Sequence, residues 1–168
     1  RAKRAAQRAI ALDDSLGVAH WAMARIRSAE LDYAAAEAEL RRAIALDPTD
    51  CRFHGWLSNV LIWTGRPVQA LAAARRALEA DPLSPYAHMR VAAALFANGR
   101  DEEALARLEP LMAIRPPLQE VQALAGTIYA SQERWPEAIA SLRPLSMTGY
   151  PPTTGLFAHV LARAGELK

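Results

Sequence analysis

The sequence has little cysteine, little lysine and no long apolar run. Its one cysteine, Cys51, cannot form a disulfide within the chain, and a cysteine-rich zinc site is excluded. Lys3 and Lys168 are the only lysines, and the formal net charge of +2 at pH 7 is too small to indicate a nucleic-acid-binding protein. The longest apolar run, residues 91–97, is far shorter than the ~20 residues that span a bilayer. We therefore expect neither nucleic acid nor membrane insertion.

The motifs of common catalytic sites are also absent. There is no Gly-rich phosphate loop, no serine nucleophile elbow, no His-Glu-x-x-His motif and no pair of carboxylates at a suggestive spacing. The adjacent acids Asp13-Asp14 and Glu102-Glu103 stand at expected helix starts, where acidic side chains interact favourably with the helix dipole. The sequence therefore predicts no enzyme, no cofactor and no metal site.

Prolines mark a fixed repeat along the chain. Pro48, Pro82 and Pro116 each follow an apolar helical run and lie 34 residues apart, and Asp14 occupies the same place one period earlier. With 52% hydrophobic and 23% charged residues, the composition is that of a folded protein. A constant period of this length indicates stacked supersecondary units and not one globular core.

Each period divides into two expected helices joined by a short turn. The first helices are expected near residues 15–30, 50–64, 84–98 and 118–132, and the second helices near residues 33–46, 67–80, 101–114 and 135–147. Small residues recur in the second helices at Ala36, Ala70, Ala104 and Ala138, which lets neighbouring helices approach closely. Pro110 and Pro144 fall inside second helices and are expected to kink them or end them early.

These residues resemble the tetratricopeptide repeat (TPR) family. The second helix of that family carries two alanines, a bulky apolar residue and a closing proline. Tyr33, Ala36, Leu40, Ala43 and Pro48 match the pattern closely. The resemblance covers essentially the whole chain, and it implies an all-α, right-handed superhelical solenoid of antiparallel helix pairs with about ten helices.

The expected boundaries give six segments. They are a second helix of a truncated repeat (1–16), three TPR units (17–50, 51–84 and 85–118), a unit with an irregular end (119–150) and a first helix of a truncated repeat (151–168). At residues 148–152, Thr-Gly-Tyr-Pro-Pro replaces the Asp-Pro ending and shifts the register by about two residues. Neither end resembles the polar capping helix of natural arrays. We therefore expect a fragment of a longer, bacterial TPR-containing protein.

The resemblance also assigns a candidate binding site, because the first helices of TPR arrays line a concave groove. The expected groove residues are Trp21, Arg25, Arg52, Trp56, Asn59, Trp63, Tyr86, Met89, Arg90 and Phe96. Arginine beside aromatic rings suits a partner with carboxylates and apolar anchors, since a guanidinium both pairs bidentately and stacks. The alternative is that Trp56, Trp63 and Phe96 turn sideways and seal contacts between helices. At the positions that correspond to the chaperone-tail clamp of this family, only Arg90 has the residue type that the clamp requires. The sequence therefore does not predict that clamp.

His20, His54 and His88 also recur every 34 residues. Equivalent points on neighbouring helices lie ~8–10 Å apart, so three such histidines cannot share one metal ion. We interpret them as partly buried packing residues.

The expected function is a protein–protein interaction scaffold that binds a peptide or partner segment with acidic and apolar groups. It would be the regulatory or assembly part of a bacterial signalling protein in the cytoplasm, with a periplasmic location also open. Two alternatives are a glycan-handling scaffold of an exopolysaccharide export system and a module that self-associates through its uncapped ends.

Overall fold

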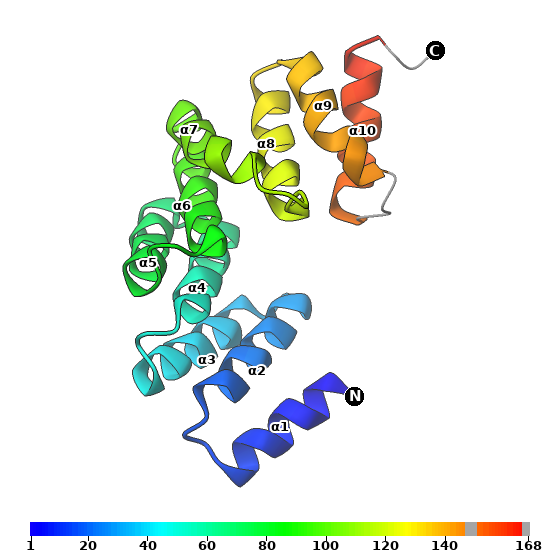
Figure 1. Cartoon of the computed structure of the whole chain (residues 1–168). Coiled ribbons are helices and arrows are strands. Elements are labelled where there is room, and N and C mark those ends of the chain that lie inside the picture. Colours follow the sequence, from blue (N-terminus) through cyan, green and yellow to red (C-terminus); the bar gives the residue numbers. More distant parts are fainter. Residues whose placement is uncertain (147–150, 166–168) are drawn as a thin grey trace. The chain divides into compact units, whose positions relative to one another are not determined.

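The structure, a computed structural model, describes residues 1–146 and 151–165, without the side chains of residues 151–154. In these residues the chain forms ten α-helices and no β-strand, which confirms the predicted all-α fold class (Figure 1). The helices belong to two compact units, residues 1–99 and 100–168. The border lies between the two helices of the predicted unit 85–118, and the other predicted repeat boundaries stay predictions.

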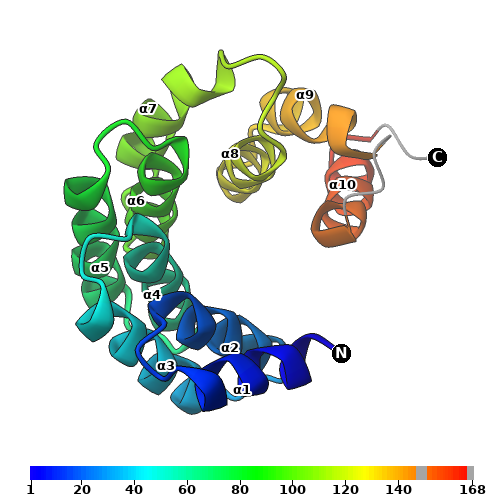
Figure 2. The same cartoon turned by 60° about the horizontal axis from the view of Figure 1, so that its bottom comes forward.

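Unit 1 is a stack of six helices. They are α1 (Ala2–Leu12), α2 (Gly17–Ala29), α3 (Tyr33–Leu46), α4 (Cys51–Trp63), α5 (Pro67–Ala80) and α6 (Pro85–Ala97). Sequential helices pack as pairs, α2 with α3 and α4 with α5, and α4 also contacts α6. Within this unit, α2, α4 and α6 lie on the inner side of the curved stack, and α3 and α5 lie on its outer side (Figure 2). The first helices of the pairs therefore share the inner surface.

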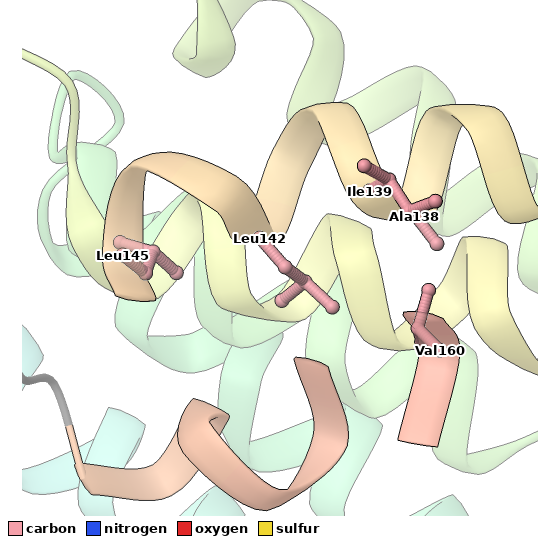
Figure 3. Packing of buried hydrophobic residues seen from close by; sticks show 5 residues of the cluster. All are labelled: Ala138, Ile139, Leu142, Leu145 and Val160. Carbon is pink, nitrogen blue, oxygen red and sulfur yellow. The ribbon is translucent and has the colours of Figure 1, made fainter. Parts of the chain in front are cut away.

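Unit 2 contains α7 (Asp101–Met112), α8 (Gln119–Ser131), α9 (Trp135–Ser146) and α10 (Pro151–Arg163). Its core centres on the apolar side chains of α9, which pack with Val160 of α10 (Figure 3). Leu142 of this core is fully buried. It leaves no room at Gly126 of α8, where an added Cβ would come within 2.5 Å of the Leu142 Cγ. Glycine at this position allows α8 and α9 to approach closely.

The helix bounds agree with the predicted ones to within a few residues. Helix α7 ends two residues after its internal proline, Pro110, and has 12 residues where α3 and α5 have 14. Pro110 thus shortens this helix, as the missing backbone donor predicts. The predicted irregular ending falls partly on residues 147–150, and the last segment ends with residues 166–168. Both stretches lie outside the described residues.

The repeat is also present in the backbone conformation of the turns. Leu31, Gly65, Gly99 and Glu133 each have a positive φ of 59–72°, and they follow one another at 34-residue intervals. Each turn is followed directly by the next helix, and Asp32 caps α3 by accepting a hydrogen bond from the Ala35 amide. The four repeating alanines of the second helices are all fully buried: Ala36, Ala70, Ala104 and Ala138. These small residues set the distance between paired helices.

The three repeating histidines tie each first helix to the turn before it. Nε2 of His54 lies 2.9 Å from the Pro48 carbonyl oxygen, and Nε2 of His88 lies 2.9 Å from that of Pro82. His20 is buried, with Nε2 at 3.0 Å from the Asp14 carbonyl oxygen and Nδ1 at 2.7 Å from Glu39 Oε2. This arrangement confirms the packing role. Among the described residues, no group of three or more His, Cys, Asp and Glu side chains could hold a metal ion.

Candidate functional site

The candidate site lies on the inner surface of unit 1, on α2, α4 and α6. Residues four apart on a helix share a face. Trp21 and Arg25 of α2 have this spacing, as do Arg52 and Trp56 of α4. The regular 34-residue period brings the two pairs to neighbouring helices, which explains why residues about 30 positions apart in sequence meet.

Arginine and tryptophan side chains alternate along this surface. The Arg25 guanidinium carbon lies 4.9 Å from the Trp21 ring centroid and 5.2 Å from that of Trp56. The Arg52 guanidinium carbon lies 5.1 Å from the Trp21 centroid. Distances below about 6 Å are in the cation–π range. We call the continuous series formed by Arg52, Trp21, Arg25, Trp56, Trp63 and Tyr33 the aromatic ladder.

Its far end consists of rings alone. Trp56 meets Trp63 edge-on, with centroids 5.9 Å apart and an interplanar angle of 81°, and the Trp63 centroid lies 5.7 Å from that of Tyr33. Trp56 Nε1 donates a hydrogen bond of 3.3 Å to Ser28 Oγ, which in turn donates to the Ala24 carbonyl oxygen at 2.9 Å. Trp56 is therefore fixed by its neighbours, whereas Trp63 stays 49% exposed. The rings pack on one another and still offer a surface to solvent.

The arginines of the site differ in how their charge is satisfied. Arg52 Nε donates to Asp50 Oδ1 at 2.9 Å, and the Arg52 guanidinium holds the pKa of the Asp50 carboxyl below its usual value. Arg90 Nη1 donates to Asn59 Oδ1, and its guanidinium carbon lies 5.3 Å from the Tyr86 centroid. Arg25 is exposed, and within residues 1–146 and 151–165 it has neither an ion pair nor a hydrogen bond. Its contacts are the two tryptophan rings.

An apolar groove of about 1120 Å³ adjoins the ladder. It is lined by Ala2, Ala5, Ala6 and Ala9 of α1, by Leu16, by Val18, Ala19, Ala22, Arg25, Ile26, Ser28 and Ala29 of α2, by Tyr33, and by Trp56 and Trp63 of α4. The sequence reasoning missed Tyr33 and the α1 alanines. The signal that could have found the alanines is the spacing of Ala2, Ala5 and Ala9, which puts a small-residue stripe on one helix face.

The other predicted groove residues lie apart from the ladder. Tyr86 packs against Gly55, where an added Cβ would come within 2.5 Å of the Tyr86 ring, and burial raises the pKa of the Tyr86 phenol. Asn59 and Met89 are buried, at 8% and 6% exposure, and Phe96 is half-buried. The structure thus brings the predicted residues together in two groups, and Met89 and Phe96 belong to neither. Trp21, Arg25, Arg52, Trp56 and Trp63 are in the ladder, and Asn59, Tyr86 and Arg90 form a second cluster.

Two stretches, residues 27–94 and 61–128, match the tetratricopeptide repeat family, and together they span more than half of the chain. The chain belongs to the tetratricopeptide repeat family. Proteins of this family generally mediate protein–protein interactions and are usually non-catalytic. No helix among the described residues of this TPR protein is long and apolar enough to cross a membrane.

Solved structures share its fold at low sequence identity. A thermophilic TPR protein of Thermus thermophilus is 18% identical with a TM-score of 0.84, covering 95% of this chain and 89% of that one. PilF of Pseudomonas aeruginosa is 21% identical with a TM-score of 0.72, covering 91% and 71%. YrrB, a TPR protein with an unusual peptide-binding site, is 22% identical with a TM-score of 0.61, covering 92% and 78%. No curated protein matches this TPR chain in sequence.

Proposed function

We propose that the inner surface of unit 1 binds a segment of another protein, with the aromatic ladder as its platform. The observation that carries the proposal is that the ladder adjoins an apolar groove of about 1120 Å³ and leaves Trp63 49% exposed. A large ring held half in water forgoes the free energy of full burial, and tryptophan is enriched among the residues that dominate binding energies. Because the rings already pack against one another, ordering them on binding loses little entropy.

The likeness to YrrB, which has a peptide-binding site, supports a peptide segment as the partner. The matches in Thermus and Pseudomonas support a bacterial origin. The finer parts of the proposal are an assembly or regulatory role in a bacterial signalling protein and a cytoplasmic location. Sequencing the flanking gene region tests the first, and fractionation of cells tests the second.

Affinity capture from source lysate with three forms of the chain tests the main proposal. We expect a partner protein to be retained by the wild type and lost from Trp63→Ala. Leu83→Ala is the matched control, because Leu83 is a large apolar side chain that is 90% exposed and does not line the groove. Equal far-UV circular dichroism spectra establish that all three fold. Retention of the same partner by Trp63→Ala, or its loss from Leu83→Ala as well, contradicts the assignment.

One observation favours self-association as a second function. Helices α1 and α10 expose alanines at repeat positions that are buried in the other helix pairs. Ala2 is exposed and Ala9 half-buried where the equivalent Ala36 and Ala43 are fully buried. With the two-residue register shift near residues 148–152, Ala158 is equivalent to Ala24, Ser58, Ala92 and Gly126, and it is exposed where these four are buried. Helix α10 of one copy could thus pair with α1 of the next. Sedimentation equilibrium tests this: we expect a concentration-dependent mass that Ala158→Glu abolishes, and a constant monomer mass contradicts it.

A further inference from the structure

Resting on the proposed function, we infer that the partner segment is an extended peptide that places one carboxylate on Arg25 and a bulky apolar side chain beside Trp63. The inference narrows the partner to a chemical class. It also assigns different roles to arginines that are indistinguishable by residue type.

The comparison of Arg25 with Arg52 carries the first step. Both guanidinium carbons lie over the same ring, 4.9 and 5.1 Å from the Trp21 centroid. Arg52 has its carboxylate already, since Nε lies 2.9 Å from Asp50 Oδ1 and 3.1 Å from Oδ2. Arg25 has no such partner in the described part of the chain. Stacking occupies the faces of a guanidinium and leaves its five N–H donors at the edge, in the geometry that binds a carboxylate bidentately.

The rest of the surface limits the number of anionic groups to one. Arg90 is half-buried and donates to Asn59 Oδ1, so it is not an open cation like Arg25. Phosphorylated segments are typically bound by clusters of arginines. A single open guanidinium beside tryptophan rings fits a carboxylate better than a phosphate.

The position of the apolar anchor follows from the distance between Arg25 and Trp63 along the ladder. The Trp56 centroid lies 5.2 Å from the Arg25 guanidinium carbon and 5.9 Å from the Trp63 centroid, so Trp63 is within about 11 Å of Arg25. An extended chain rises about 3.3 Å per residue. A side chain two or three residues from the acid therefore reaches Trp63 and the groove wall formed by Ile26 and Ala29.

Synthetic peptides titrated against the full 168-residue chain test this inference, with tryptophan fluorescence and isothermal calorimetry as readouts. The probes are decapeptides with acetylated and amidated ends, one Glu, and one Phe at a spacing of one to five residues. We expect the tightest binding at a spacing of two or three. Replacing the peptide Glu with Gln should weaken that binding at least about tenfold, because the amide has no charge and only one acceptor oxygen, so the bidentate pair with the guanidinium is lost. A Gln peptide with a free C-terminal carboxylate at the same distance from Phe tests whether a terminal group serves equally. Tighter binding of that peptide than of the Glu peptide identifies the preferred source as terminal.

The protein variants form a matched pair. Arg25→Gln should weaken the Glu peptide at least about tenfold, whereas Arg76→Gln, which removes an exposed cation of α5 outside the ladder and the groove, should leave its affinity within about twofold. Arg25 is exposed, so its replacement should not disturb folding, which circular dichroism checks.

The outcomes separate this inference from the proposed function. If Trp63→Ala abolishes peptide binding while Arg25→Gln binds as well as the wild type, the platform stands and the carboxylate inference is wrong. If no peptide binds the wild type, or if Trp63→Ala and Arg25→Gln both bind the Glu peptide as well as the wild type does, the proposed function and the carboxylate inference are both wrong. Binding of an oligosaccharide of hexuronic acid in place of the peptides overturns the inference in favour of an acidic glycan.

Discussion

Ser58 carries a buried hydroxyl that costs the protein stability. Ser58 is fully buried in α4, and its Oγ has no hydrogen-bond partner in the described residues. The equivalent positions one repeat before and after hold Ala24 and Ala92, both fully buried, so alanine fits this site of the helix pair. We therefore expect Ser58→Ala to stabilise unit 1.

The size of the effect follows from three contributions. An unsatisfied buried polar group costs about 1–3 kcal/mol, which the substitution removes. Alanine is a better helix former than serine by about 0.5 kcal/mol. The space left by one oxygen atom costs a few tenths of a kcal/mol, at about 24 cal/mol per Å³. The net gain is about 1–3 kcal/mol, and each kcal/mol raises the melting temperature of a unit of this size by roughly 4–8 °C.

Ser28 provides the control, because it is also buried, at 6% exposure, on the neighbouring first helix. Its Oγ is bonded on both sides, donating to the Ala24 carbonyl oxygen and accepting from Trp56 Nε1. Ser28→Ala leaves that indole donor unpaired and should destabilise by about 1 kcal/mol. Thermal and urea unfolding followed at 222 nm measure both variants. A Ser58→Ala protein that is no more stable than the wild type would refute the reasoning, since the hydroxyl would then have a partner.

Three further substitutions have expected outcomes in urea unfolding. Gly126→Ala should cost about 1–3 kcal/mol by overpacking against Leu142, and combining it with Leu142→Ala should cost less than the sum of the two. Leu31→Gly should stabilise by up to about 1 kcal/mol, because leucine is strained at φ 61°. Arg66 donates to Glu37 and lowers the pKa of that carboxyl from its usual 4.5, so its contribution to stability is present above pH 4.5 and lost as the pH falls through the folded value. Glu37→Gln should flatten this acid dependence, and an unchanged pH profile would contradict it.

The helices could be predicted closely because their boundaries depend on local chemistry. Asp32 and Ser84 accept hydrogen bonds from amides of the helices they precede, and the positive φ of Gly65 and Gly99 ends the preceding helices in the way glycine favours. These signals lie within a few residues of the boundary they determine. The 34-residue period repeats these signals, so a helix boundary that is ambiguous in one unit can be placed from the corresponding residues of the next unit.

Whether each site residue is paired or unpaired, and exposed or buried, was harder to predict, because this depends on side chains from other helices. The sequence assigned Arg25 and Arg52 the same role, although only Arg52 has an acid two residues away, at Asp50. That neighbour was a usable signal. No local signal indicated that Trp63 would pack on Tyr33 of α3 and remain half exposed, since this depends on rotamers and on the crossing of three helices.

A comparison of repeat positions within the chain separates structure from function. Positions that join paired helices keep small residues in successive repeats, as at Ala24, Ser58, Ala92 and Gly126, all of them buried. Positions on the inner surface change in every repeat, as at Trp21, Gly55, Met89 and Ala123, or at Arg25, Asn59, Ala93 and Thr127. A substitution at a joining position changes the distance between helices, whereas one at an exposed inner position such as Arg25 changes the surface and leaves that distance alone. Such a scaffold can therefore carry a recognition site in one unit, such as the one proposed at Trp21 and Arg25, without rebuilding the contacts that hold the repeats together.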